Sequence, residues 1–92
     1  MARVSMEAFE GRDVEPVFIA GSVREAERVE EVLTRLGIEF AVKIEPFVRY
    51  ILAVLPSEHE GAAFYVLSGH SAYCRRALAA AGLGSGLMGD SP

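Results

Sequence analysis

The stretch that decides the fold runs from residue 16 to residue 44 and reads PVFIAGSVREAERVEEVLTRLGIEFAVKI. It begins with a compact apolar run that ends at Gly21, which is typical of a buried strand. Ser22 can then cap a helix, and Glu25 stands three residues later, where it completes a capping box. The stretch therefore predicts a strand followed at once by a helix.

The expected helix is marked by apolar residues that recur at helical spacing, namely Val23, Ala26, Val29, Val32, Leu33 and Leu36. Charged residues fill the opposite face, and Gly37 stands where helices commonly end in a left-handed conformation. Residues 38–44 then alternate between apolar side chains at even positions and Glu39, Ala41 and Lys43 at odd positions. This alternation indicates a half-buried strand.

Two further strands are expected downstream. Pro46 breaks the strand over residues 38–44, and residues 48–55 form a third strand that Pro56 ends. Residues 57–61 predict an exposed turn, and residues 62–67 predict a fourth strand.

A second helix is expected to begin near residue 69 or 71 and to end before Gly82, with Ser68 or Ser71 as its N-cap. Arg75 and Arg76 are expected to point outward. The predicted inward face consists of Tyr73, Cys74, Ala77, Leu78 and Ala81.

The predicted order is β-α-β-β-β-α, which places the chain in the α+β class. Two helices can cover one face of a mostly antiparallel four-stranded sheet, so we expect a two-layer sandwich with a ferredoxin-like topology. Residues 16–83 would form the single domain, residues 1–15 a loose N-terminal arm, and residues 84–92 a flexible C-terminal tail.

The composition argues against nucleic-acid binding, an internal disulfide and a membrane span. The chain has 92 residues, enough for one domain, and its 9 basic residues are outnumbered by 13 acidic ones. We therefore expect no nucleic-acid partner, because phosphate binding needs a cluster of cations. A single cysteine excludes an internal disulfide and fits a reducing compartment. No apolar run approaches the length of a membrane span, so we expect a soluble, cytoplasmic protein with no membrane partner.

The chain contains two similar units, each a strand, a Gly- or Ser-containing turn, a helix and a terminal glycine. The chain resembles a bacterial family of domains of unknown function that are regarded as prokaryotic signal-transducing proteins. The resemblance is carried by residues 17–22, 25–27 and 36–38 of the first unit and by residues 65–67, 74–78 and 81–83 of the second. The resemblance covers roughly residues 16–83.

This resemblance implies a ferredoxin-like fold and a distant similarity to PII-type signalling proteins. The resemblance implies no ligand-binding residues in this chain. The chain departs from the family pattern by the apolar strand over residues 48–55, and it has no long effector loop like that of PII-type proteins. An ATP or 2-oxoglutarate site is therefore not implied.

Three residues are candidates for ligand binding. Gly21 and Ser22 precede a helix, where free backbone N–H groups can hold an anion, although Ser22 can equally act as a simple cap. His70 stands four residues before Cys74, so the two side chains can share a metal or form a thiol–base pair. The alternative is a structural, buried Cys74.

No catalytic residue, metal site or cofactor is expected. Glu58, His59 and Glu60 contain acid–base groups, but a solvated turn favours the same residues. The leading hypothesis is a non-enzymatic regulatory or signal-transducing domain that acts through a partner protein or a small effector. The alternatives are an assembly or docking subunit without a ligand and a small thiol- or metal-dependent enzyme.

Three of the predicted strands are apolar on both faces, which predicts an uncovered apolar sheet surface. We therefore expect a homodimer that forms through the open face of the sheet. The rival expectation is intramolecular, with Met6, Phe9 or the tail around Leu87 folded across that face.

Overall fold

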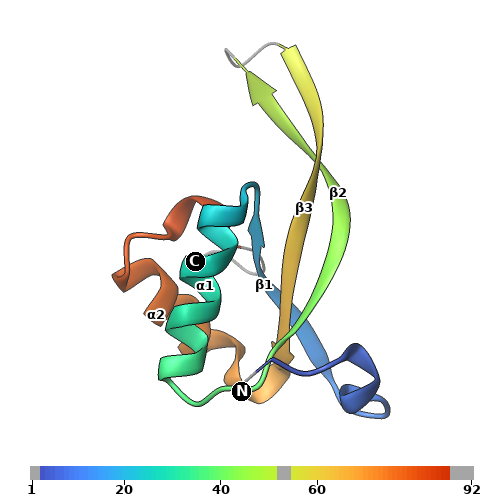
Figure 1. The fold of residues 1–92 in the computed structure, drawn as a ribbon, viewed down its shortest axis with the longest axis vertical. Coiled ribbons are helices and arrows are strands. Elements are labelled where there is room, and N and C mark those ends of the chain that lie inside the picture. Colours follow the sequence, from blue (N-terminus) through green and yellow to red (C-terminus); the bar gives the residue numbers. More distant parts are fainter. Residues whose placement is uncertain (1–2, 52–54, 88–92) are drawn as a thin grey trace.

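The computed structural model describes residues 3–51 and 55–87, and only the backbone of residues 46–51, 55–60 and 85. The elements follow the order η1 (Met6–Phe9), β1 (Val14–Ala20), α1 (Val23–Arg35), β2 (Ala41–Ile51), β3 (Leu55–Leu67), η2 (Ser68–His70), α2 (Ser71–Ala80) and η3 (Gly84–Gly86), where η is a 3-10 turn. Both helices lie on one side of an antiparallel sheet (Figure 1). The predicted α+β class is confirmed.

Helix α1 forms as the sequence predicts, because both of its ends are fixed by local hydrogen bonds. The Glu25 backbone N–H donates to the Ser22 hydroxyl over 3.1 Å, and the Gly21 N–H donates to the Glu25 carboxylate over 2.9 Å. At the other end Gly37 has a φ of 72°, and the Ile38 N–H donates to the Leu33 carbonyl over 3.1 Å. This is a Schellman motif, and it turns the chain toward β2.

Helix α2 ends in the same way but begins differently from the prediction. Gly82 has a φ of 84°, and the Leu83 N–H donates to the Leu78 carbonyl over 3.0 Å. His70 occupies the N-cap position, and its side chain makes no capping hydrogen bond. The prediction of Ser68 or Ser71 as N-cap is wrong, because the Ser71 hydroxyl donates to the Ser68 carbonyl instead.

Two predictions about the faces of α2 also need correction. Cys74 and Leu78 are buried as expected, whereas Tyr73 is 50% exposed. Arg75, predicted to point outward, lies against β1 and donates to the Glu15 carboxylate over 3.0 Å. The mostly alanine face of this helix explains the errors, because small residues mark no clear apolar side.

The described sheet has three strands in the order β1-β3-β2, so the four-stranded ferredoxin-like prediction is wrong. Residues 38–44 and 48–55 were expected to be separate strands, but residues 41–44 and 48–51 both lie in β2, which continues through Pro46. Strand β2 pairs with β3 alone and forms an edge of the sheet. A proline is tolerated there because an edge strand needs hydrogen bonds on one side only.

The prediction of an exposed turn over residues 57–61 is also wrong. These residues belong to β3 and pair with residues 45–49 of β2. Pro56 pairs with Tyr50, in a part of β3 that lies beyond the last β1 partner, Ala62, and so needs only one neighbouring strand. Residues 52–54, which join β2 to β3 in the sequence, lie outside the described residues.

The two strands therefore make one long hairpin that extends past the rest of the sheet. Strand β1 ends where Ala20 pairs with Ala62, while β2 and β3 continue to pair from Glu45–Gly61 to Ile51–Leu55. At about 3.4 Å per residue, this hairpin extension, residues 45–51 and 55–61, is about 24 Å long. Figure 1 shows it projecting from the body of the molecule.

The core lies between the helices and the sheet face that they cover, which we call the helix-side face. Phe64 on the central strand pairs with Phe18 on one side and Val42 on the other. The rings of Phe40 and Phe64 lie 5.7 Å apart at an angle of 44°. Val29 and Leu33 of α1 close this layer without solvent exposure.

The opposite face, which we call the outer face, is partly covered by the N-terminal segment. Figure 1 shows η1 beside the strands on the side away from the helices, and its Phe9 is buried. The Val4 N–H donates to the Phe40 carbonyl over 2.8 Å, which ties this segment to the start of β2. Ala41 and Ala63 are fully buried on this face. The intramolecular expectation for Phe9 therefore has structural support, whereas Met6 is 37% exposed.

The C-terminal segment packs against the free edge of β1. Leu87 forms an isolated antiparallel bridge with Phe18, and Leu83 is buried. A Cβ placed on Gly86 would lie 2.4 Å from the Phe18 ring, so only glycine fits at this approach. Within residues 3–51 and 55–87, none of the helices is long and apolar enough to cross a membrane.

Candidate functional site

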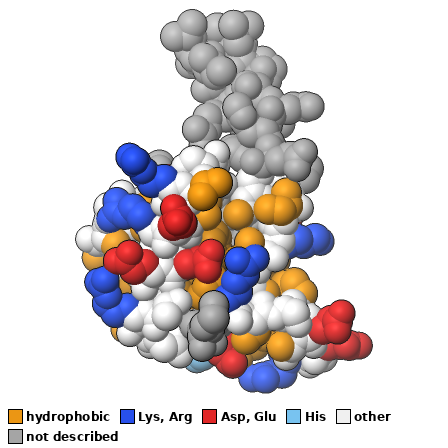
Figure 2. Space-filling view, viewed as in Figure 1, with side chains coloured by type: hydrophobic (Ala, Val, Ile, Leu, Met, Phe, Trp, Pro, Cys, Tyr) orange, Lys and Arg blue, Asp and Glu red, His pale blue; other side chains and the backbone are white. Residues whose placement is uncertain are grey.

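An apolar hollow lies where the first turn of α1 meets the root of the hairpin extension. Its volume is about 440 Å³, and it is lined by Ala20, Gly21, Ser22, Val23, Ala26, Ile44, Gly61 and Ala62. Val23 is 77% exposed and Ile44 is 62% exposed, although both are large apolar residues. Figure 2 shows hydrophobic side chains gathered at this upper end of the body.

Gly21 and Ser22, two of the predicted ligand-binding residues, line this hollow. Their polar groups are already used within the chain, because the Gly21 N–H donates to the Glu25 carboxylate and the Ser22 hydroxyl accepts from the Glu25 N–H. The place that an external anion would take at the helix N-terminus is thus held by Glu25. The geometry favours a cap over an anion site.

His70, the third predicted residue, lies at the other end of the sheet. It follows β3 at Leu67, which pairs with Val14, whereas Ser22 follows β1 at Ala20, which pairs with Ala62. Six residues of strand separate the two ends, or about 20 Å. The structure therefore does not bring the three candidate residues together.

The His70–Cys74 pair is split between solvent and core. His70 is exposed, and Cys74 has no exposed surface and packs in the main core cluster. Burial raises the pKa of the Cys74 thiol to about 11, with Arg75 opposing the shift. Among the described residues no three His, Cys, Asp or Glu side chains gather as a metal site would require. Cys74 has the environment of a structural cysteine.

This environment predicts that Cys74 is slow to react. Its pKa rises from 9.0 to about 11, so at pH 8 the thiolate population falls ~100-fold, and burial slows attack further. We expect a thiol-specific reagent to label the native protein more than ~100-fold more slowly than free cysteine at pH 8, and faster as the pH approaches 11. Protein unfolded in urea is the control. Native labelling at the rate of free cysteine would restore the thiol-enzyme hypothesis.

A polar cluster that the sequence does not reveal joins β1 to α2. Glu15 accepts from Arg75 over 3.0 Å and contacts the Ser71 hydroxyl over 3.4 Å. The hydrogen bond from Arg75 is the main cause that lowers the pKa of Glu15 below 4.5. Because these residues lie 60 positions apart, no spacing rule could have found the pair. The cluster fixes the start of α2 on the sheet.

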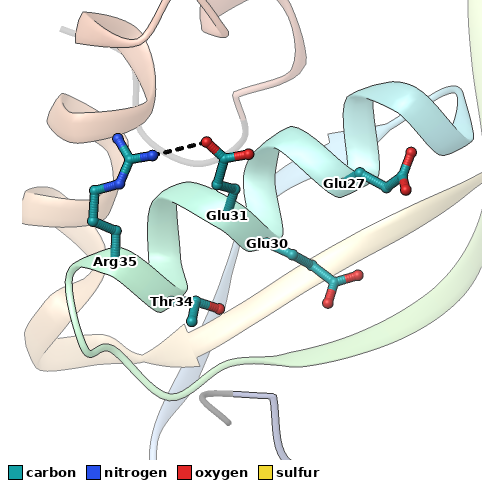
Figure 3. Close-up of a pocket in the computed structure, with 5 residues that line it drawn as sticks. All are labelled: Glu27, Glu30, Glu31, Thr34 and Arg35. Atoms are coloured by element: carbon teal, nitrogen blue, oxygen red, sulfur yellow. Dashed lines mark hydrogen bonds and ion pairs between the residues drawn. The ribbon is translucent and has the colours of Figure 1, made fainter.

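The outward face of α1 carries a shallow acidic surface. It is lined by Glu27, Glu30, Glu31, Thr34 and Arg35 (Figure 3). Glu31 pairs with Arg35 over 2.8 Å, and Glu30 pairs with Arg3 over 3.6 Å. Figure 3 shows Glu30 and Glu31 pointing to different sides of the helix, so the carboxylates do not converge on one point. This is a solvated helix face.

Strand β2 carries an apolar row that runs beyond the helices. Phe40 and Val42 contribute to the core on the helix-side face, and Ile44 borders the hollow. Strand alternation places positions 46, 48 and 50 on the same face, and the sequence there is Pro, Val and Tyr. Of the odd positions, 43, 45 and 49 are charged, whereas 47 and 51 are Phe and Ile. Apolar residues at the even positions therefore continue into the hairpin extension, where neither helix reaches (Figure 1), and the odd positions there are mixed.

Comparisons with known proteins add no relative: no family model, no curated protein and no solved structure matches this chain. The similarity to prokaryotic signal-transducing domains stays a prediction from the sequence.

Proposed function

We propose that this domain is a regulatory, signal-transducing module that acts by binding a partner protein through its hairpin extension and performs no chemistry of its own. The observation that carries the proposal is the apolar row of β2, which continues past the helix layer. Apolar positions on a strand favour a covering layer, and within residues 3–51 and 55–87 neither helix reaches this part of β2 (Figure 1).

The stability of the hairpin extension supports the same function. A two-stranded ribbon is marginally stable in water by itself, because it has no layer against which to bury side chains. Among the strands that the structure describes, none lies beside the seven residue pairs from Glu45–Gly61 to Ile51–Leu55 as a third strand. Contact with a partner would stabilise this segment and couple binding to its order.

The contact is expected on a face of the extension, not along its edges. Natural proteins guard exposed strand edges with proline and lysine, because unpaired backbone groups invite further strands. Pro46 lies in β2 opposite Glu60, and Pro56 lies in β3 opposite Tyr50, so each strand of the extension contains a residue without an N–H. Lys43 adds an exposed charge near the root.

A photocrosslinking amino acid at position 48 tests this proposal in the native host cell. Position 48 lies in the apolar row, and position 49 on the opposite face of the same strand is the matched control. We expect a discrete crosslinked product from position 48 and little from position 49. Equal labelling at both positions, or no product at either, would show that the extension binds no protein through this face.

A small apolar effector is the second candidate, because the hollow of about 440 Å³ has the size of a small-molecule site. A thermal-shift screen with apolar organic acids and amino acids examines it directly. A compound at 100 times its dissociation constant stabilises the fold by about 2.7 kcal/mol. Val23→Glu should abolish that shift, since Val23 is an exposed wall of the hollow.

A further inference from the structure

We propose that the hydrogen bond between Tyr65 and Glu45 holds the root of the hairpin extension to the body, so that breaking this one bond opens the root while the body stays folded. Tyr65 lies in the three-stranded part of the sheet, and Glu45 is the first residue of β2 in the extension. The consequence of this inference rests on the proposed docking function, because the bond would regulate the order of the binding segment. The contact itself belongs to the chain alone.

The bond crosses from the three-stranded to the two-stranded part of the sheet on its outer face. Tyr65 pairs with Ala41, and Glu45 pairs with Gly61, four residues farther along each strand, which is a distance of about 14 Å. The phenol hydroxyl of Tyr65 donates to the Glu45 carboxylate, so the two side chains lie along the strands toward each other. Ala63 lies between the two pairs on the same face and has no exposed surface. The two side chains therefore meet over a small, buried residue.

Among the described residues, the helix-side face gives the root little support. Ile44, the residue before Glu45, is 62% exposed and borders the hollow. Strand β1 ends where Ala20 pairs with Ala62, one residue short of the pair that contains Glu45. At the point where the third described strand ends, the bond on the outer face ties the extension to the body.

A bond of this kind is strong enough to decide the order of a two-stranded ribbon. Hydrogen bonds to an ionised carboxylate are roughly twice as strong as neutral ones, and such a ribbon is marginally stable in water. The hydrogen bond to Glu45 is the main cause that raises the pKa of the Tyr65 phenol to about 12, with burial second. The phenol therefore remains a donor to the carboxylate throughout the neutral pH range.

Amide hydrogen exchange of the purified full chain tests this role with matched variants. Tyr65→Phe removes the bonded hydroxyl and keeps the ring, and Tyr73→Phe removes a hydroxyl from a half-exposed residue on α2. We expect Tyr65→Phe to speed exchange of the amides at the root, residues 45–47 and 59–61, about 10-fold. The control should change exchange there less than ~2-fold. Root amides that respond equally to both variants would overturn the proposal.

Leu33→Ala separates local opening of the root from unfolding of the whole chain. Leu33 is fully buried in the body, away from the extension, so its truncation weakens the body and leaves the Tyr65–Glu45 bond intact. We expect Leu33→Ala to speed exchange of the Phe64 amide at least ~10-fold and exchange at the root less than ~2-fold. If it speeds both regions equally, the extension opens only when the whole chain unfolds, and the proposal is wrong.

An NMR titration of the tyrosine rings tests the bond itself. We expect Tyr65 to titrate with a pKa of about 12 in the wild-type chain, and with a pKa closer to 10.0 in Glu45→Gln, because glutamine carries no negative charge. A pKa of Tyr65 that Glu45→Gln leaves unchanged would show that the bond does not form in solution.

Crosslinking from position 48 in the cell separates this inference from the docking function. If Tyr65→Phe opens the root in the purified protein and the wild-type chain gives no crosslinked product, the bond holds the extension and the docking function fails. If the root amides do not respond to Tyr65→Phe and position 48 still crosslinks a partner, the bond has no such role and the docking function stands.

Discussion

Replacing Phe64 by alanine is expected to lower the free energy of unfolding by about 3–5 kcal/mol, the largest loss for any single substitution considered. Phe64 lies on the central strand, has no exposed surface, and stands between Phe18 of β1 and Val42 of β2. Truncation leaves a cavity where helices and sheet meet, and the packed neighbours cannot close it. A domain of this size has only about 5–14 kcal/mol of stability, so Phe64→Ala should be close to unfolding.

Urea denaturation followed by circular dichroism measures this loss. Tyr73→Ala is the matched control, because it removes an aromatic ring that is half exposed on α2. We expect the control to cost less than about 1 kcal/mol. Equal losses at Phe64 and Tyr73 would mean that the core does not lie between the helices and this face of the sheet.

The second large effect is expected at Leu33, where alanine should cost about 2–5 kcal/mol. Leu33 is fully buried in α1, and its carbonyl also accepts the N–H of Ile38 in the terminal Schellman motif. Because alanine favours helix formation, the cost measures lost packing and not lost helix propensity. Thermal unfolding of Leu33→Ala should therefore show a clearly lower midpoint than the wild-type chain.

Glu27→Ala provides the comparison on the same helix, since Glu27 is exposed and lies on the outward face. We expect a change within about 0.5 kcal/mol. If Glu27→Ala destabilised the protein as much as Leu33→Ala, helix α1 would have to be rotated about its axis relative to the structure.

Local signals in the sequence predict the helices well, and topology is where prediction fails. The Ser22 cap and the glycine at position 37 act within one turn of α1, so their effect does not depend on the rest of the fold. The meaning of Pro46 and Pro56 depends on strand order, which is a non-local property. Both prolines lie where a strand has a neighbour on one side only, and they interrupt no pairing there.

The candidate site also combines features that local sequence signals predict with features that depend on strand pairing and helix docking. The hollow contains Gly21 and Ser22, which the sequence marks as the start of a helix, but Ile44 reaches it only through the pairing of β2 with β3. The link between Arg75 and Glu15 depends on the docking of α2 against β1, which periodicity in the weakly amphipathic α2 does not specify. The sequence predicts alternation for residues 38–44 only, and it predicts residues 48–55 as a separate strand that is apolar on both faces. That residues 41–51 form one strand, which extends past the helices, follows only from the pairing of β2 with β3.

The proposed function depends on the hairpin extension being an ordered ribbon that a partner covers. Amide hydrogen exchange of the full chain tests the order of this ribbon directly. We expect the amides of residues 45–51 and 55–61 to exchange more slowly than those of an unfolded chain but faster than the Phe64 amide in the core. Exchange of the extension at the rate of an unfolded chain would contradict an ordered hairpin.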